Sequence, residues 1–303
     1  MSDALDNFRS APVQQLDLGS VRLHYRVFGH SHAPAVLLLH GWPLSGVTYR
    51  HLIETLRHSY RCYVPDLPGA GDTPWSPHIQ NTVHGYVEVL RAFVDTLQLE
   101  SLAIIGHDSG GGVGRLLAAQ LGSRVNCVVL QNTELPDYIS PLFRFLKLTA
   151  ASGVGASLMQ QLLRLRAFRR SPLAFGSAFG ERDLIDGEFY DACVEPLLRD
   201  ISGHAAALSH LDFSFIRSLP EAHGRIEAPI HLFWGGSDRE YFPLEKARQM
   251  QSQFRVRGEL KVIPEAKLFV HEEAHEALSH FCLQVLAWGN ARRSEAIDGA
   301  NHR

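Results

Sequence analysis

The chain has 303 residues, of which 45% are hydrophobic and 20% are charged, and its formal net charge is −3. These values are ordinary for a soluble globular protein and give no indication of binding to nucleic acid or to a membrane surface. The four cysteines are far apart and form no CxxC pair, which argues against disulfides and a metal centre. No apolar run has the length of a signal peptide or of a membrane span, so we expect a cytoplasmic protein.

Short apolar segments alternate with helical segments up to about residue 130. We expect strands at residues 21–27, 35–40, 61–65, 102–105 and 125–130. We expect helices at residues 48–56 and 83–97, and a third that follows the glycines after residue 105 and ends at residue 120. Strands that alternate with helices predict a mainly parallel sheet that is covered on both faces.

The alternation stops in residues 134–228, where glycine and proline interrupt helical segments and almost no strand is expected. It resumes with strands at residues 229–234 and 259–263 and helices at residues 244–254 and 272–288. The sequence therefore predicts an α/β core in two parts that a helical insertion separates. The predicted division is a core of residues 1–133 and 229–290, a helical cap of residues 134–228 and a polar tail of residues 291–303.

A tight turn with a nucleophile is predicted directly after the strand at residues 102–105, where the sequence reads GHDSGG. In this type of turn, a strand leads into the sequence Gly-x-nucleophile-x-Gly, and a helix follows. The turn is so tight that small residues must flank the nucleophile. The register of Gly106 and Gly110 places Asp108 at the apex, because a nucleophilic Ser109 would put His107 where a small residue is needed. A carboxylate has a reference pKa of about 4, so it can displace a leaving group at a saturated carbon without first losing a proton. The alternative is that Asp108 simply caps the following helix.

Four motifs follow one another along the chain: HGWP (40–43), PDLPGAGDT (65–73), GHDSGG (106–111) and WGGSD (234–238). With these motifs the chain resembles the α/β-hydrolase family in its aspartate-nucleophile branch, which contains epoxide hydrolases, haloalkane dehalogenases and fluoroacetate dehalogenases. The resemblance implies an α/β-hydrolase fold, a small-molecule substrate and no cofactor or metal. It does not indicate an oligomeric state.

The resemblance also assigns roles to single residues. The backbone N–H groups of Trp42 and Ser109 form the oxyanion hole, which stabilises charge on the ester oxygen. His40 lies beside the substrate and holds the loop. Asp238 is the acid that orients the imidazole of the triad, and Glu134 is the alternative acid.

The catalytic histidine of the family is missing from the predicted position. Relatives read approximately IPGAGHFVHEEAPEAL where this chain has VIPEAKLFVHEEAHEAL, so Leu268 occupies the position of the base. Three interpretations remain open. His271 acts as the base from the start of the helix, or another group such as His204 or His210 does so. The third is that the protein no longer completes hydrolysis.

The substrate class follows from residues around the site. Haloalkane dehalogenases usually have a tryptophan after the nucleophile and often an asparagine in the HG-x-P motif, whereas this chain has Ser109 and Trp42. Epoxide hydrolases protonate the epoxide oxygen with tyrosines of the cap, and Tyr138 and Tyr190 are the candidates. The sequence thus favours an enzyme that opens an epoxide, or less readily a carbon–halogen bond, over a non-hydrolytic binding protein on the same fold.

Overall fold

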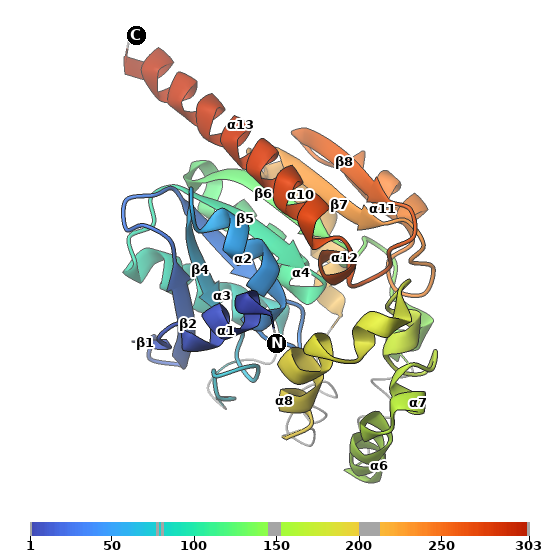
Figure 1. Ribbon diagram of the computed structural model, residues 1–303. Coiled ribbons are helices and arrows are strands. Elements are labelled where there is room, and N and C mark those ends of the chain that lie inside the picture. Colours follow the sequence, from blue (N-terminus) through green and yellow to red (C-terminus); the bar gives the residue numbers. More distant parts are fainter. Residues whose placement is uncertain (1, 77–78, 80–81, 145–152, 200–212, 302–303) are drawn as a thin grey trace.

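The computed structural model describes residues 2–76, 79, 82–144, 153–199 and 213–301. Its centre is an eight-stranded sheet with the order β1-β2-β4-β3-β5-β6-β7-β8 (Figure 1). Strand β1 is antiparallel to β2 and β2 to β4, and all other pairs are parallel. The strands are β1 (Gln14–Asp17), β2 (Arg22–Phe28), β3 (Ala35–Leu39), β4 (Arg61–Pro65), β5 (Leu102–His107), β6 (Val125–Gln131), β7 (Ile230–Gly235) and β8 (Arg257–Ile263). The predicted α/β-hydrolase fold with a mainly parallel sheet is confirmed.

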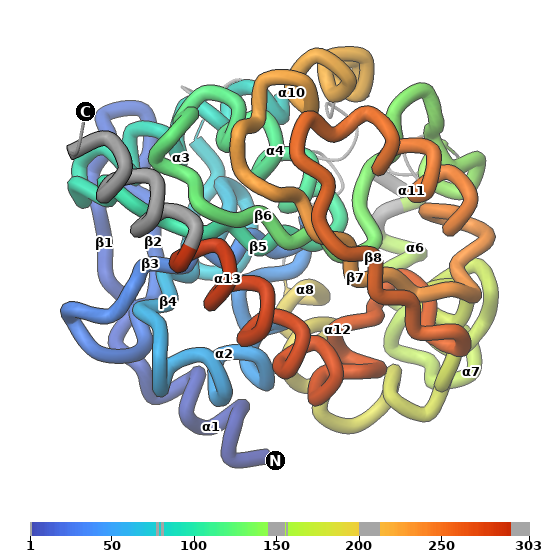
Figure 2. Tube along the Cα trace, turned by 90° about the horizontal axis from the view of Figure 1, so that it is seen from above, coloured from blue at the N-terminus to red at the C-terminus, as the bar shows by residue number. Residues whose placement is uncertain are grey.

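The central strands are buried on both faces. Every residue of β5 and of β7 is buried, as expected for continuous apolar segments in a parallel sheet. Figure 2 shows α3, α4 and α10 on one side of the strands and α1, α2 and α13 on the other. These helices are α1 (Asp3–Ser10), α2 (Arg50–Leu56), α3 (Val83–Thr96), α4 (Ser109–Leu121), α10 (Leu219–Arg225) and α13 (His275–Asn301). Because helices cover both faces of the sheet, a functional site is expected at the ends of the strands.

The structure differs from the sequence prediction in three places: it has two elements that were not expected, and one expected helix is divided. The strand β1 is not expected, because it lies at the sheet edge with mostly exposed side chains and has no apolar pattern. The helix α1 is missed because only three apolar residues mark it, although Ser2 caps its first turn. The expected helix at residues 272–288 is divided into α12 (Val270–Glu273) and α13, and α13 continues to Asn301.

Helices occupy the described part of the segment between β6 and β7. They are α6 (Gly153–Arg164), α7 (Arg166–Arg169), η3 (Phe175–Ser177), η4 (Arg182–Ile185), η5 (Tyr190–Val194), α8 (Glu195–Leu197), η6 (Ser214–Ser218) and α10. In Figure 1, α6, α7 and α8 lie together beyond the end of the sheet at which α12 starts. Helix α10 instead packs against α4 and thus belongs to the layer that covers the sheet.

Buried ion pairs connect this helical segment to the core. The guanidinium of Arg50 donates to both carboxylate oxygens of Glu272 at 2.7 and 2.8 Å, and its Nε donates to Glu188. Glu188 also accepts a hydrogen bond from the Ser2 N–H at 2.8 Å. One arginine therefore joins α2, α12 and the segment before η5. Within the residues described, no helix is long and apolar enough to cross a bilayer.

Candidate active site

Asp108 occupies the apex of a strained turn between β5 and α4. Its backbone has φ +48° and ψ −131°, values that a non-glycine residue adopts only where the surroundings enforce them. A Cβ on Gly110 would lie 2.1 Å from the Leu39 carbonyl oxygen, and one on Gly106 would lie 2.7 Å from the Gly110 carbonyl oxygen. The packing around the turn thus requires the two glycines whose spacing selected Asp108.

The carboxyl group of Asp108 lies in a buried and acidic environment. Asp108 is only 9% exposed. Burial first, and then the nearby Glu134 and Asp238, raise the pKa of Asp108 well above its ordinary value. The expectation of an ordinary carboxylate pKa near 4 is therefore wrong, because three acids meet at one place that water hardly reaches.

Hydrogen-bond geometry around Thr133 favours a protonated Glu134. The Thr133 hydroxyl lies 2.7 Å from the Asp108 carbonyl oxygen and 2.8 Å from Glu134 Oε2, yet it has one proton to donate. A proton on Glu134 would satisfy both contacts. Burial raises the pKa of Glu134, although Arg115 lies 3.8 Å away and opposes this shift.

One of the two donors expected to form the oxyanion hole, the Trp42 N–H, already has a hydrogen-bond partner in the protein. The Trp42 N–H donates to the Ser109 hydroxyl oxygen at 2.7 Å. The Ser109 backbone N–H, in contrast, acts to lower the pKa of Asp108. The serine that replaces the more usual tryptophan thus satisfies the Trp42 donor with its own side chain.

Asp238 is held firmly by groups of the core. Its carboxylate accepts hydrogen bonds from the Asn132 side-chain amide at 2.9 Å, from the Tyr241 N–H at 3.0 Å and from the Phe242 N–H at 3.1 Å. Burial raises the pKa of Asp238 to about 6, against the effect of these donors. The oxygen of the Asn132 amide accepts from the Gly235 N–H at 2.7 Å, so this residue joins the ends of β6 and β7.

Leu268 places a buried apolar side chain at the predicted position of the base. It is 6% exposed, and its carbonyl oxygen accepts a hydrogen bond from His107 Nε2 at 2.9 Å. Among the described residues, no histidine donates to Asp238. The predicted triad acid Asp238 therefore has amide donors where an imidazole was expected.

His271 is buried beside the elbow and packs against other rings. It is 3% exposed, and its ring centre lies 4.2 Å from that of His107 and 5.9 Å from that of Tyr49. Neither ring nitrogen has a hydrogen-bond partner in the part of the chain that is described. Burial and then the nearby His107 and Arg50 hold the pKa of His271 well below its ordinary value, so the ring is neutral.

His40 fixes the loop before α2 through its main-chain contacts. Its Nε2 accepts from the Leu67 N–H at 2.9 Å, and its Nδ1 lies 3.1 Å from the Gly41 carbonyl oxygen. Because a carbonyl oxygen only accepts, the proton is on Nδ1. Both nitrogens are thus used by the main chain.

The two candidate tyrosines have different surroundings. The guanidinium of Arg169 lies over the Tyr190 ring at 4.1 Å from its centre. Tyr138 forms an isolated bridge with Leu135, and burial, followed by the charge of Asp238, raises its pKa. Tyr138 therefore lies within electrostatic range of Asp238. His204 and His210 lie outside the described residues.

Tyr241 is a site residue that the sequence prediction missed. Its hydroxyl lies 3.1 Å from the Ser177 hydroxyl of the helical segment, and its backbone N–H donates to Asp238. Burial raises its pKa to about 12, and the charges of Asp238 and Asp108 contribute to the rise. Its position three residues after Asp238 was the only signal in the sequence, and an aromatic residue in a loop does not stand out there.

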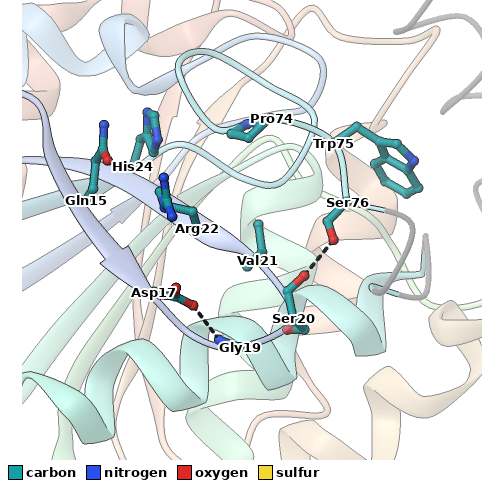
Figure 3. A pocket seen from close by; sticks show the side chains of 10 residues that line it. All are labelled: Gln15, Asp17, Gly19, Ser20, Val21, Arg22, His24, Pro74, Trp75 and Ser76. Atoms are coloured by element: carbon teal, nitrogen blue, oxygen red, sulfur yellow. Dashed lines mark hydrogen bonds between the residues drawn. The ribbon is translucent and has the colours of Figure 1, made fainter.

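A separate groove lies on the opposite edge of the sheet, around β1 and β2 (Figure 3). It has a volume of about 460 Å³ and is open to solvent. Its lining is about equally polar and apolar and consists of Gln15, Asp17, Gly19, Ser20, Val21, Arg22, His24, Pro74, Trp75 and Ser76. None of the candidate catalytic residues lines it.

A mainly parallel sheet with a strained acidic elbow after β5 defines a protein of the α/β-hydrolase class. Residues 34–274 match the family model described as alpha/beta hydrolase fold, and the chain belongs to this family.

Several curated relatives are hydrolases. Haloalkane dehalogenase 2 of Mycobacterium tuberculosis (strain H37Rv) is 26% identical over 263 residues, which cover 85% of this chain and 89% of the relative. An uncharacterized hydrolase of Saccharomyces cerevisiae is 34% identical over 132 residues, 44% of each chain. Epoxide hydrolase 4 of Homo sapiens is 30% identical over 118 residues, 39% of this chain and 33% of the relative. The match thus spans less than half of the yeast and human relatives.

Solved structures support the fold. The epoxide hydrolase CorEH has a TM-score of 0.74 at 20% identity, with 92% of this chain and 99% of that chain covered. The lip1 protein of Acinetobacter baumannii AYE has a TM-score of 0.79 at 21% identity, with 95% of each chain covered.

Proposed function

We propose that this protein opens an epoxide or a carbon–halogen bond of a small organic molecule and forms an ester on Asp108. The observation that carries the proposal is the apex position of Asp108, with its φ of +48° and the glycines that the turn requires. An oxygen of Asp108 attacks the saturated carbon, and the bond to the epoxide oxygen or halide breaks. Helices between β6 and β7 cap the site, and the substrate lies between them and the strand ends.

The named relatives support this reaction class without deciding the substrate. The mycobacterial relative is a haloalkane dehalogenase and the human relative is an epoxide hydrolase. Ser109 and Trp42 replace the residues that bind halide in dehalogenases. The tyrosines Tyr138 and Tyr241 both lie within electrostatic range of Asp238. We therefore favour an epoxide over a haloalkane, with Tyr138 or Tyr241 as the donor to the epoxide oxygen.

The second step of the proposed reaction has lost its usual base. Hydrolysis of the ester needs a group that takes a proton from the attacking water, and this assistance is worth typically 10²–10⁴-fold. Leu268 cannot supply it. We therefore expect one ester for each protein molecule that forms faster than it is hydrolysed, and slow turnover thereafter.

A second candidate function is the binding of a small molecule without hydrolysis. The pKa of Asp108, raised by burial and by Glu134, favours this alternative, because a protonated carboxyl is a poor nucleophile. In that case Asp108 would only hydrogen-bond its ligand.

Intact-mass spectrometry tests the proposed function. The protein is incubated with a panel of reactive epoxides and organohalides, and peptide mapping locates any added mass. We expect one adduct on Asp108 in the wild type and none in Asp108→Asn. If no compound of the panel gives an adduct although some bind, the binding function is the better description.

A further inference from the structure

We propose that His107, the residue before the nucleophile, supplies the base that position 268 lacks. This inference rests on the proposed ester on Asp108. It assigns a residue to the slow second step and thereby deepens the proposed function.

The tautomer of His107 follows from its contact with the main chain. Its Nε2 lies 2.9 Å from the Leu268 carbonyl oxygen. A carbonyl oxygen can only accept a hydrogen bond, so Nε2 carries the proton and Nδ1 has a free lone pair. The residue is 1% exposed, and Nδ1 has no hydrogen-bond partner among the described residues. A buried nitrogen with a free lone pair is thus held next to the nucleophile.

The position of Nδ1 relative to the carboxylate is given by the packing around Gly41. A Cβ on Gly41 would lie 2.9 Å from Asp108 Oδ2 and 3.1 Å from His107 Nδ1. Both atoms therefore flank the same glycine, and in the proposed step one water molecule bridges them. A side chain at position 41 would press against both groups, so glycine is the residue that is compatible with their placement.

The surroundings keep His107 neutral and make it a weak base. Burial, together with His40, lowers its pKa to about 4, whereas the contact with the Leu268 carbonyl raises it. The groups that face its ring are His40, His271, Asp108 and the Leu268 carbonyl. At neutral pH the lone pair is therefore available, but the driving force for proton transfer is small. Slow hydrolysis is the expected consequence.

Hydrolysis of the Asp108 ester needs only water and His107. Water attacks the ester carbon of Asp108, an O–C bond forms, and the proton moves to His107 Nδ1. The tetrahedral oxyanion then collapses, the bond to the alkyl oxygen breaks, and the leaving alkoxide takes the proton from Nδ1. The alcohol departs, and Asp108 retains one oxygen atom from water.

The test measures how fast a preformed adduct is lost. Protein carrying the ester is freed of excess reagent, and the adduct mass is followed with time in wild type and in His107→Gln. Glutamine keeps an N–H donor for the Leu268 carbonyl but has no basic nitrogen, so it separates catalysis from positioning. We expect the loss to be about 10²-fold slower in His107→Gln. The matched control is His231→Gln, since His231 is equally buried (4% exposed) in β7 and its Nδ1 accepts from the Glu259 N–H.

Two further readouts decide the role of His107. A base with a pKa of about 4 gives a rate of adduct loss that is flat between pH 5.5 and 8, whereas an ordinary histidine gives a rise near pH 6.5. Added imidazole should restore adduct loss in His107→Ala, which leaves space for it.

Several outcomes overturn the inference. Equal rates of adduct loss in wild type and His107→Gln would exclude His107 as the base, and so would a permanent adduct in the wild type. A slow rate in His271→Gln with a normal rate in His107→Gln would assign the base to His271. In contrast, the absence of any adduct on wild-type Asp108 would overturn the proposed function itself.

Discussion

The backbone N–H of Trp42 donates a 2.7 Å hydrogen bond to the side-chain hydroxyl of Ser109. A donor of the expected oxyanion hole is thus occupied by the residue that follows the nucleophile. Substitution of this serine tests both the assignment of the nucleophile and the state of the hole.

We expect Ser109→Ala to form the adduct at a rate within a few-fold of the wild type and to lose it faster. The alanine frees the Trp42 N–H for the oxyanion that forms during hydrolysis, and one such donor is worth about 10²–10³-fold. Adduct accumulation and loss, followed by intact mass, measure both rates. An adduct that Asp108→Asn still forms and Ser109→Ala does not would assign the nucleophile to Ser109.

Leu268→His should shorten the lifetime of the adduct. The new imidazole would occupy the position of the family's base, and we expect a gain of about 10²-fold in hydrolysis. Leu268→Phe is the matched control, because it adds a ring without a base. The gain should be smaller in Leu268→His combined with Asp238→Asn, since the acid orients the imidazole. Equal lifetimes in Leu268→His and Leu268→Phe would show that the side chain at 268 does not reach the ester.

The rate of adduct formation should rise with pH. Attack requires the ionised carboxylate, and burial together with Glu134 and Asp238 raises the pKa of Asp108 well above its ordinary value. The midpoint of the rise should therefore lie far above pH 4. A haloalkane is the appropriate reagent, because its halide leaves without protonation. Glu134→Gln removes an acid that competes with Asp108 for ionisation and should move the midpoint to lower pH; an unchanged midpoint would contradict the proposed coupling of the two acids.

Folding stability provides a check on the burial of His231. Burial lowers its pKa to about 4, so between pH 6.5 and 4 it is protonated in the unfolded chain only. Because only the unfolded chain binds this proton, the free energy of unfolding decreases as the pH falls through this range, by about 1.4 kcal/mol per pH unit. Relative to the wild type, His231→Gln should gain about 2 kcal/mol between pH 8 and pH 5. Urea denaturation at both pH values measures this difference, and a difference that does not change with pH would contradict it.

The order of the elements and the apex of the elbow could be read from the sequence. Apolar segments of strand length stand out from amphipathic helices because their periodicities differ. Asp108 could be chosen over Ser109 because only glycine fits beside the turn, and the contacts of Gly106 and Gly110 explain why. The polar strand β1 and the short helix α1 were not found, because neither has an apolar pattern long enough to be recognised.

The state of the site was decided only by the tertiary structure. Asp108, Glu134 and Asp238 lie far apart in the chain, and their mutual effect on pKa depends on burial and distance, which no local pattern reports. The same holds for His107: its motif marks it as a flanking residue, whereas its tautomer is set by the carbonyl of Leu268, 161 positions later in the chain. The sequence by itself determined which residues stand at the strand ends. The packing of those ends against one another decided which of them carry a proton, because desolvation and hydrogen-bond partners arise only when distant segments meet.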